Sequence, residues 1–405
     1  MFLEILLFTL AGIFGGIVAG LIPGIHTNTL ILIVFNLLPL LAGFPVQAVV
    51  ALIVSMAITS TLVDFIPSIF LNAPSEDTAL SILPGHRLLL EGKGLEAVFL
   101  SVIGGIGVIL LFIFLSPLMV KSLPIIYSFA KPRMAWLLLA VVGVMILTEK
   151  GRKKLWGLLM FLLAGILGLI TLNSTLMQPD FVFFPLFTGM FGISSLIISL
   201  KDKTSLPQQM KDFGVVRKSL ALIGSIKGFF AGLLVGILPG LGSAQAGTLV
   251  QTITRKEDNR EFLVSLGGIN TANALFAITA LYTIGRPRSG AAVAIEKILG
   301  NFGFNDFIML IAVSLIAVGI AAIATLFLSR KFLILVEKIP YNKISISILS
   351  LLLVLTIIFT GPMGLLVLVV STAIGLVAPL TGVKRSLGMA VIILPVIFFY
   401  LGINL

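Results

Sequence analysis

Two stretches of the sequence decide the fold, GGIVAGLIPGIHTNT at residues 15–29 and AGLLVGILPGLGSAQAGT at residues 231–248. They align without gaps through the proline, so that Gly16 corresponds to Gly232 and Pro23 to Pro239. Proline lacks a backbone donor and glycine weakens a helix, so a helix that meets both is expected to break. The sequence therefore predicts a duplicated element with one broken helix in each copy.

The composition is that of an integral membrane protein. Of the 405 residues, 59% are hydrophobic and only 11% are charged, whereas about a quarter are charged in soluble domains. The apolar residues form runs of about 20, the length of a helix that crosses the hydrocarbon layer. There is no cysteine, and only two histidines are present. Because the sequence also lacks zinc-hydrolase and nucleotide-binding motifs, we expect no metal site, no catalytic residues, and no cofactor beyond a coupling proton or sodium ion.

The hydropathy pattern predicts five membrane spans in each half. Helical hairpins are expected at 5–43 and 220–254, around the Pro-Gly pairs, and shorter re-entrant pieces at 74–90 and 287–300. A hairpin returns to its own side, so an odd number of spans places the two halves in opposite orientations. The predicted fold is an all-α polytopic membrane protein with inverted repeats at 1–200 and 219–405, joined by a cytoplasmic linker at 201–218. The expected spans are 46–70, 97–119, 134–148, 155–172 and 181–200, then 262–284, 306–328, 345–360, 363–378 and 387–402.

The distribution of basic residues agrees with this topology. The net charge is +11, but the basic residues form short clusters between apolar runs and not the continuous stripe of a nucleic-acid-binding protein. If the loop EKGRKK at 149–154 is cytoplasmic, most of the 27 basic residues lie on that side, as the positive-inside rule requires. The cluster at 121–133 is the exception. We expect a multi-pass protein of the cell (inner, cytoplasmic) membrane with its N-terminus outside.

Small and polar residues follow both Pro-Gly pairs. An unsatisfied backbone group in lipid costs several kcal/mol, so broken helices persist only where they are buried or line a watery cavity. The helix that restarts after a break offers free N–H groups and a positive dipole end to an anion. The glycines before each proline are better explained by close helix packing. The candidate substrate-binding residues at the two breaks are Gly24, Thr27, Asn28, Thr29, Gly240, Ser243 and Gln245.

A second matched pair of prolines lies in NAPSEDTAL, at residues 72–80, and in GRPRSGAAV, at residues 285–293. Asn72 and Ser75 flank the first proline, and Arg286 and Arg288 flank the second. Asn72 and Ser75 are candidate substrate ligands because they flank the expected break at Pro74. A guanidinium binds a carboxylate or phosphate with two parallel hydrogen bonds, so Arg286 and Arg288 are candidate substrate ligands as well. The alternative for the arginines is that they anchor the outer headgroup region.

Acidic residues within apolar runs are candidates for ion coupling. Asp64 lies inside TSTLVDFIPSIF, at residues 59–70, and Glu76 and Asp77 follow closely. Ionisable groups inside spans usually face a cavity or a partner, which makes these three candidate proton or sodium ligands. The alternatives are that Asp64 meets water at a span end and that Glu76 and Asp77 cap the next helix. The polar residues of GGINTANALF, at residues 267–276, either join helices by hydrogen bonds or line a cavity.

The two Pro-Gly stretches, together with IFLNAPSEDTALSILPGHRLLLEGKGLEA at residues 69–97, resemble the large permease subunit of the tripartite tricarboxylate transporters, the TctA family. The family pattern is matched by Leu71, Asn72, Pro74, Ser75, Thr78, Gly85, Gly92 and Ala97. The chain departs from it at Glu76, at Arg286 and Arg288, and in being shorter. The resemblance implies a carrier of citrate-like carboxylates, driven by a cation gradient, that works with a small membrane subunit and an extracytoplasmic binding protein.

The leading hypothesis is therefore a cation-coupled carboxylate transporter, not an enzyme, whose two halves rock around a site near the midplane of the bilayer. The partners expected are a small anionic substrate, the lipid bilayer and the two accessory proteins, with a homodimer left open. The alternative keeps the fold and changes the cargo to a lipid-linked phosphate such as polyprenyl phosphate, because helix N-termini and arginines bind phosphate as readily as carboxylate.

Overall fold

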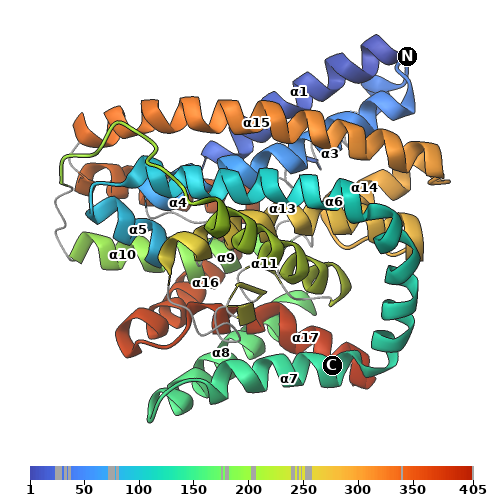
Figure 1. The fold of residues 1–405 in the computed structure, drawn as a ribbon. Coiled ribbons are helices and arrows are strands. Elements are labelled where there is room, and N and C mark those ends of the chain that lie inside the picture. Colours follow the sequence, from blue (N-terminus) through green and yellow to red (C-terminus); the bar gives the residue numbers. More distant parts are fainter. Residues whose placement is uncertain are drawn as a thin grey trace.

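The computed structural model describes residues 1–22, 30–31, 34, 38–71, 78, 82–174, 177, 182–201, 207–238, 242–243, 246–247, 249–250, 258–338 and 341–403. Throughout this part of the chain, the regular elements are helices and none is a strand (Figure 1). The first half contains α1 (Phe2–Leu21), η1 (Leu38–Leu41), α3 (Val46–Val63), α4 (Phe65–Phe70), α5 (Ile82–Leu90), α6 (Gly94–Ala130), η3 (Lys131–Arg133), α7 (Met134–Leu147), α8 (Lys153–Leu172), α9 (Phe183–Phe187), η5 (Thr188–Ile193) and α10 (Ser194–Lys201). The second half contains α11 (Lys218–Ile237), α13 (Asn259–Ile284), α14 (Gly290–Leu299), α15 (Phe304–Lys338), α16 (Tyr341–Thr381), η6 (Arg385–Met389) and α17 (Ala390–Leu401).

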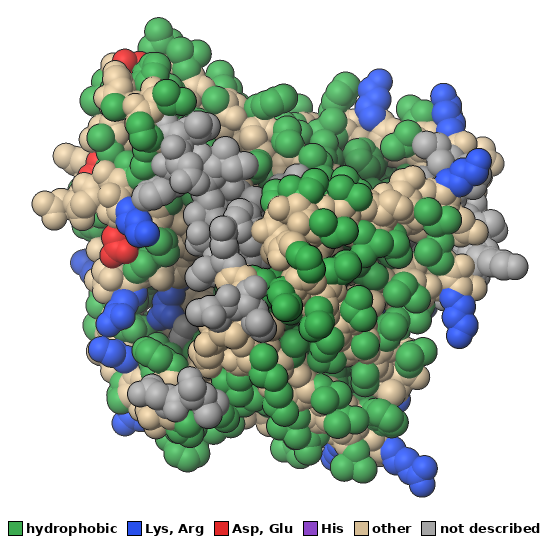
Figure 2. Space-filling model, turned by 180° about the vertical axis from the view of Figure 1, so that it is seen from behind, with side chains coloured by type: hydrophobic (Ala, Val, Ile, Leu, Met, Phe, Trp, Pro, Cys, Tyr) green, Lys and Arg blue, Asp and Glu red, His purple; other side chains and the backbone are tan. Residues whose placement is uncertain are grey.

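The helices form a multi-pass membrane protein. Among the described residues, 8 helical segments are long and apolar enough to cross a bilayer. Figure 2 shows hydrophobic side chains over the middle of one face, with Lys and Arg gathered toward two opposite edges. That distribution matches an apolar belt between two charged, headgroup-facing ends.

The helices follow the predicted spans, with two differences in length. The expected spans 345–360 and 363–378 are the two arms of α16, on either side of a kink at Gly361, where φ is 64° and favours glycine. Helix α15 continues to Lys338, beyond the expected end at residue 328. The span predicted to end at residue 119 continues as α6 to Ala130, although Pro117 and Pro124 lie inside it. Proline is tolerated in membrane helices where neighbouring groups satisfy the freed carbonyls.

The order of elements is repeated in the second half. Helices α1 and α11 are both 20 residues long, and each is followed by a long apolar helix, α3 with α4 in the first half and α13 in the second. A short helix comes next, α5 or α14, and then a very long one, α6 or α15. The pair α7 and α8 corresponds to the two arms of α16, and α9 to α10 corresponds to α17. The duplication seen in the sequence is therefore also a duplication of structure.

Glycines set the packing inside each copy. A Cβ on Gly12 would overlap Ser55, and one on Gly20 would lie 2.7 Å from the Cβ of Val63, so α1 and α3 run parallel in close contact. In the second half, α11 runs parallel to α13 in the same way. Two consecutive helices can be parallel only if the chain between them crosses back to the side on which the first helix began. The predicted hairpins have this property. The interpretation of these glycines as packing residues is confirmed.

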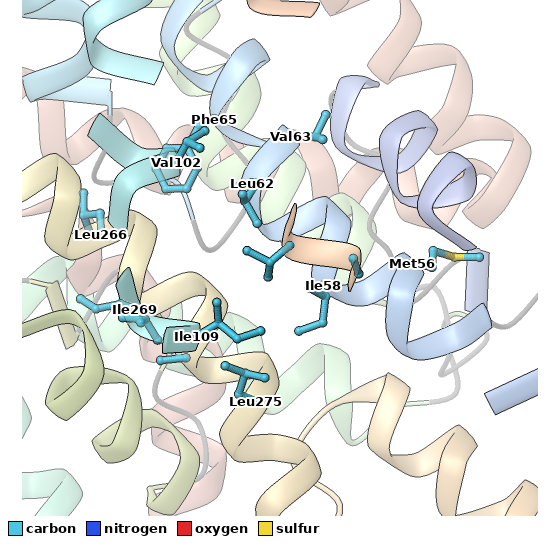
Figure 3. Close-up of a cluster of buried hydrophobic side chains, with 14 of the residues drawn as sticks. Met56, Ile58, Leu62, Val63, Phe65, Val102, Ile109, Leu266, Ile269 and Leu275 are labelled. Carbon is cyan, nitrogen blue, oxygen red and sulfur yellow. The ribbon is translucent and has the colours of Figure 1, made fainter. Parts of the chain in front are cut away.

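The two copies are interlocked through α6 and α13. Arg260 at the start of α13 pairs with Glu96 at the start of α6, and further along the rings of Phe112 and Phe276 lie 5.4 Å apart. These helices from different halves therefore run parallel. Buried side chains of α3, α4, α6 and α13 fill the space between them (Figure 3).

Helix α3 runs opposite to α6. A Cβ on Gly105 would lie 3.5 Å from Leu62, whereas one on Gly94 would lie 2.9 Å from Phe70, so residue numbers fall along α3 and α4 as they rise along α6. Because α6 is parallel to α13, α3 is antiparallel to α13, its own counterpart in the repeat. Both chain ends lie at one end of the helix bundle and the linker lies at the other (Figure 1).

The apolar interior is divided into two cores, each built from both halves. The first core joins α1, α3, α4, α5 and most of α6 with α11, α13, α14, α15 and a few residues of η5, α10 and α16. The second joins the end of α6, α7, α8, α9 and part of η5 with part of α16, η6, α17 and residues near the ends of α11 and α13. Each core therefore contains residues of both predicted repeats.

The linker is fixed in place where the structure describes it, at residues 207–217. Gln209 is buried and donates to the carbonyl oxygen of Leu89 at 2.8 Å, while its side-chain oxygen accepts from the backbone N–H of Gly94 at 3.1 Å. Its own backbone N–H donates to Glu337 in α15 at 3.3 Å. The linker therefore connects the ends of α5, α6 and α15.

The α6–α13 contact can be tested with Gly104→Ala. A Cβ there would overlap the carbonyl oxygen of Val264, which belongs to the backbone and cannot rotate away. We expect the free energy of unfolding to fall by about 1–3 kcal/mol. Gly143→Ala in α7 is the matched control, because nothing lies within 4 Å of its added Cβ. Thermal unfolding in detergent measures both variants, and an equal effect of the two would contradict this packing.

Candidate functional site

Both Pro-Gly pairs lie directly after a helix end. Helix α1 ends at Leu21, and its cap residue Ile22 has φ −96° and ψ 106°. Helix α11 ends at Ile237, and its cap residue Leu238 has φ −94° and ψ 111°. The expected helix breaks are therefore confirmed, with almost the same backbone conformation in each copy.

Most of the residues predicted at the breaks lie outside the described residues. The described ones are Ser243, which is fully buried, and Asp64, Arg286 and Arg288. A common pocket formed by both breaks therefore stays a prediction. The site residues outside the described part of the chain are Gly24, Thr27, Asn28, Thr29, Asn72, Ser75, Glu76, Asp77, Gly240 and Gln245.

Asp64 lies within a membrane-spanning segment, at the junction of α3 and α4. Its backbone N–H donates to the carbonyl oxygen of Ser60 at 3.0 Å, so the helical turn continues through it. The side chain is half-buried and points toward α1, where a Cβ on Gly20 would lie 3.0 Å from Oδ1. The carboxylate thus lies beside the last turn of α1, immediately before the first break.

A buried hydrogen-bonded group lies one turn from Asp64. The Asn270 side chain donates to the backbone carbonyl oxygen of Thr61 at 3.0 Å, and the hydroxyls of Thr61 and Thr271 are 3.2 Å apart. Asn270 and Thr271 therefore join α13 to α3 by hydrogen bonds, while Asn273 is half-buried. The sequence analysis did not select Thr61, although it belongs to the same polar run as Asp64.

The two arginines around Pro287 occupy different environments. Arg286 is exposed, whereas Arg288 is half-buried. The Arg288 guanidinium donates to the carbonyl oxygen of Ile237 at 3.0 Å, at the C-terminus of α11, and lies 5.2 Å from the ring centre of Tyr127. Of the two predicted ligands, only Arg288 therefore lies partly buried at the second break, whereas the Arg286 guanidinium is at the surface.

Arg288 has no carboxylate partner among the described residues. Burial lowers the pKa of its guanidinium, and the nearby phenols of Tyr127 and Tyr400 partly oppose that shift. An arginine pKa is so high that the group stays charged. Its Nε is buried without a hydrogen-bond partner in the structure. The site therefore holds one positive charge that the described part of the chain does not neutralise.

The comparisons with known proteins agree with this architecture. The model of the tripartite tricarboxylate transporter TctA family matches residues 6–390. The chain belongs to the TctA family. It is also 32% identical to an uncharacterized protein of Methanocaldococcus jannaschii over 98% of this chain and 99% of that one. No solved structure matches it. As a TctA protein, it belongs to a family of tricarboxylate transporters, as the resemblance implied.

The contact between Arg288 and α11 can be tested by thermal unfolding. Arg288→Gln removes a charge-assisted hydrogen bond to a helix C-terminus, and we expect a loss of about 1.5–3 kcal/mol. Arg286→Gln changes the same charge at an exposed position, and we expect a change within about 0.5 kcal/mol. Equal stabilities of the two variants would show that Arg288 does not hold the end of α11.

Proposed function

We propose that this protein is a cation-coupled secondary transporter of organic di- and tricarboxylates, and not an enzyme. The observation that carries the proposal is Arg288, a half-buried cation without a carboxylate partner among the described residues, beside the second Pro-Gly break. A guanidinium matches the geometry of a carboxylate and binds it most strongly where water is excluded. The family membership supports the same class of cargo.

The substrate site is proposed to lie between the two breaks. Asn28, Thr29 and their neighbours after the first break, and Ser243 and Gln245 after the second, would present hydroxyls, amides and helix N-termini to the anion. Ser243 is buried, which supports a position inside the protein. Asn72 and Ser75 are proposed to complete the site from the first half, opposite Arg288. Arg286 is exposed, and we leave it out of the proposed site.

An inverted repeat suits alternating access, because two equivalent arrangements of the copies open to opposite sides. The antiparallel course of α3 and α13, and the position of the linker opposite both chain ends, support the inversion. Each core contains helices from both halves. We therefore propose that the movement takes place between the two cores and not between the two halves.

Asp64 is the proposed coupling residue, with Glu76 and Asp77 as further candidates. A carboxylate inside a span is costly unless it binds a proton, a cation or a partner. Asp64 lies at the end of α1, so binding of a proton or sodium ion there would change the charge directly beside the first break.

The accessory proteins are proposed from the family. A small membrane subunit and an extracytoplasmic binding protein would deliver the carboxylate from outside, and the cell membrane would supply the cation gradient. The exposed apolar surface contacts lipid and leaves room for the small subunit or a second copy of this chain (Figure 2).

Uptake into proteoliposomes tests the cargo. We expect labelled citrate or a dicarboxylate to accumulate only under an imposed proton or sodium gradient. Arg288→Lys keeps the charge but loses the paired donors, and we expect KM to rise about tenfold, which corresponds to about 1.4 kcal/mol. Arg286→Lys is the comparison variant, with a KM within about twofold of the unchanged protein. No accumulation of any carboxylate would reject the proposal, and competition by polyprenyl phosphate would favour a lipid-linked cargo.

Asp64→Asn tests the coupling. The amide retains the shape of the carboxylate but can neither take up a proton nor neutralise a sodium ion. We expect gradient-driven accumulation to fall at least tenfold, while exchange of internal for external substrate continues at about the original rate. Parallel accumulation and exchange assays measure the two rates. Equal loss of both would assign Asp64 a structural role.

A further inference from the structure

A second arginine without a carboxylate partner lies at the other end of α17 from Arg288. Tyr400, near the end of α17, interacts with Arg288, whereas Arg385 begins η6, which leads into α17. At about 1.5 Å per helical residue, the two arginines are roughly 20 Å apart along the helix. Arg385 therefore lies toward the opposite membrane surface, beside the loop at 149–154 that is expected to be cytoplasmic.

The guanidinium of Arg385 is positioned by a hydroxyl and not by a carboxylate. It donates to Ser195 Oγ of α10, and Ser195 is completely buried. Arg385 itself is half-buried, so it is partly removed from water. A guanidinium has five N–H donors, and no ion pair with Arg385 is present in the described part of the chain.

Two further cations lie on the loops that adjoin Arg385 in the sequence and the fold. The Lys384 side chain donates to the Thr148 hydroxyl, and a Cβ on Gly382 would lie 2.8 Å from Lys153 Nζ, so the loops before α8 and before η6 meet. The acid here, Glu149, is buried and accepts the backbone N–H of Lys384 at 2.9 Å. The three basic side chains thus outnumber the local carboxylate.

The surface next to these cations carries exposed apolar residues, as expected at the depth of the lipid headgroups. Trp156, in the first turn of α8, is 45% exposed, and Leu155 beside it is 70% exposed. Tryptophan collects at the membrane interface, where its ring is apolar and its N–H is wet. Trp136, the second of the 2 tryptophans, is also exposed and lies near the start of α7, at the other end of the α7–α8 pair.

We infer that Lys153, Lys384 and Arg385 form a binding site for the phosphate of an anionic phospholipid on the side of the 149–154 loop. The phosphate oxygens would accept from the Arg385 guanidinium and from the two ammonium groups, and the acyl chains would lie along the exposed apolar residues of α8. A phosphate matches the paired donors of a guanidinium, and a net-negative headgroup matches the excess positive charge. The site is separate from Arg288, so it does not depend on the proposed cargo.

Thermal unfolding of the purified full chain in detergent tests this site. Dioctanoyl phosphatidylglycerol is the probe, and dioctanoyl phosphatidylcholine, which has no net charge, is the comparison lipid. We expect phosphatidylglycerol to raise the unfolding temperature more, and Arg385→Gln to raise the lipid concentration for half of that shift at least tenfold. Lys150→Gln is the matched control, because it removes one exposed charge from the same loop, and we expect a change within twofold.

Each other outcome is decisive. An unchanged phosphatidylglycerol response in Arg385→Gln would overturn the site. Stabilisation by sodium phosphate that competes with phosphatidylglycerol would assign the site to free phosphate and overturn the lipid. If Arg385→Gln does not fold, Ser195→Ala and Arg385→Lys replace it. Each is expected to weaken the lipid response at least threefold, and full responses in both would reject the proposal.

Discussion

The backbone contact between α6 and α13 is the constraint on which the rest of the structure depends. Lipid is as apolar as leucine, so helices in a membrane associate through close packing and polar contacts and not through the hydrophobic effect. Gly104 of α6 lies against Val264 and Gly268 of α13, and Gly267 of α13 lies against Ser101 of α6, so the two backbones touch. Because these helices belong to different copies of the repeat, neither copy can satisfy its glycine face alone, and the two must fold together.

Interlocking also decides which parts could move. A transporter built from two independent halves could rock one against the other, but here each core contains helices from both. Helix α6 passes from the first core into the second between Met119 and Leu123. Pro117 and Pro124 flank this passage and remove backbone hydrogen bonds from it. A relative movement of the cores would bend α6 where its own hydrogen bonding is weakest.

Hydropathy and the Pro-Gly pattern were sufficient to predict the class, the duplication and most helix positions, because span length and helix breaking are local properties. The lateral contacts were not predictable, since they join residues far apart in the chain. Thr61 meets Thr271, and Gln209 meets Gly94, through packing that no local pattern reveals. Arg286 and Arg288 looked equivalent for the same reason, and only the fold places one against the end of α11. The extension of α6 to Ala130 and of α15 to Lys338 likewise depended on tertiary context.

Electrostatics separates the structural cations from those able to bind a ligand. Arg260 with Glu96 is a neutralised pair between the two copies, and Lys227 with Glu261 is one between α11 and α13 of the second copy, so the charge of both cations is already used in holding helices together. Arg288 and Arg385 are held instead by a carbonyl oxygen and a hydroxyl. Such dipoles fix the position of a guanidinium but leave its full charge, and desolvating that charge costs free energy that an anion would recover. Arg288, beside the second break, is the proposed ligand of the carboxylate, and Arg385, at the other end of α17, is the proposed ligand of the phospholipid phosphate.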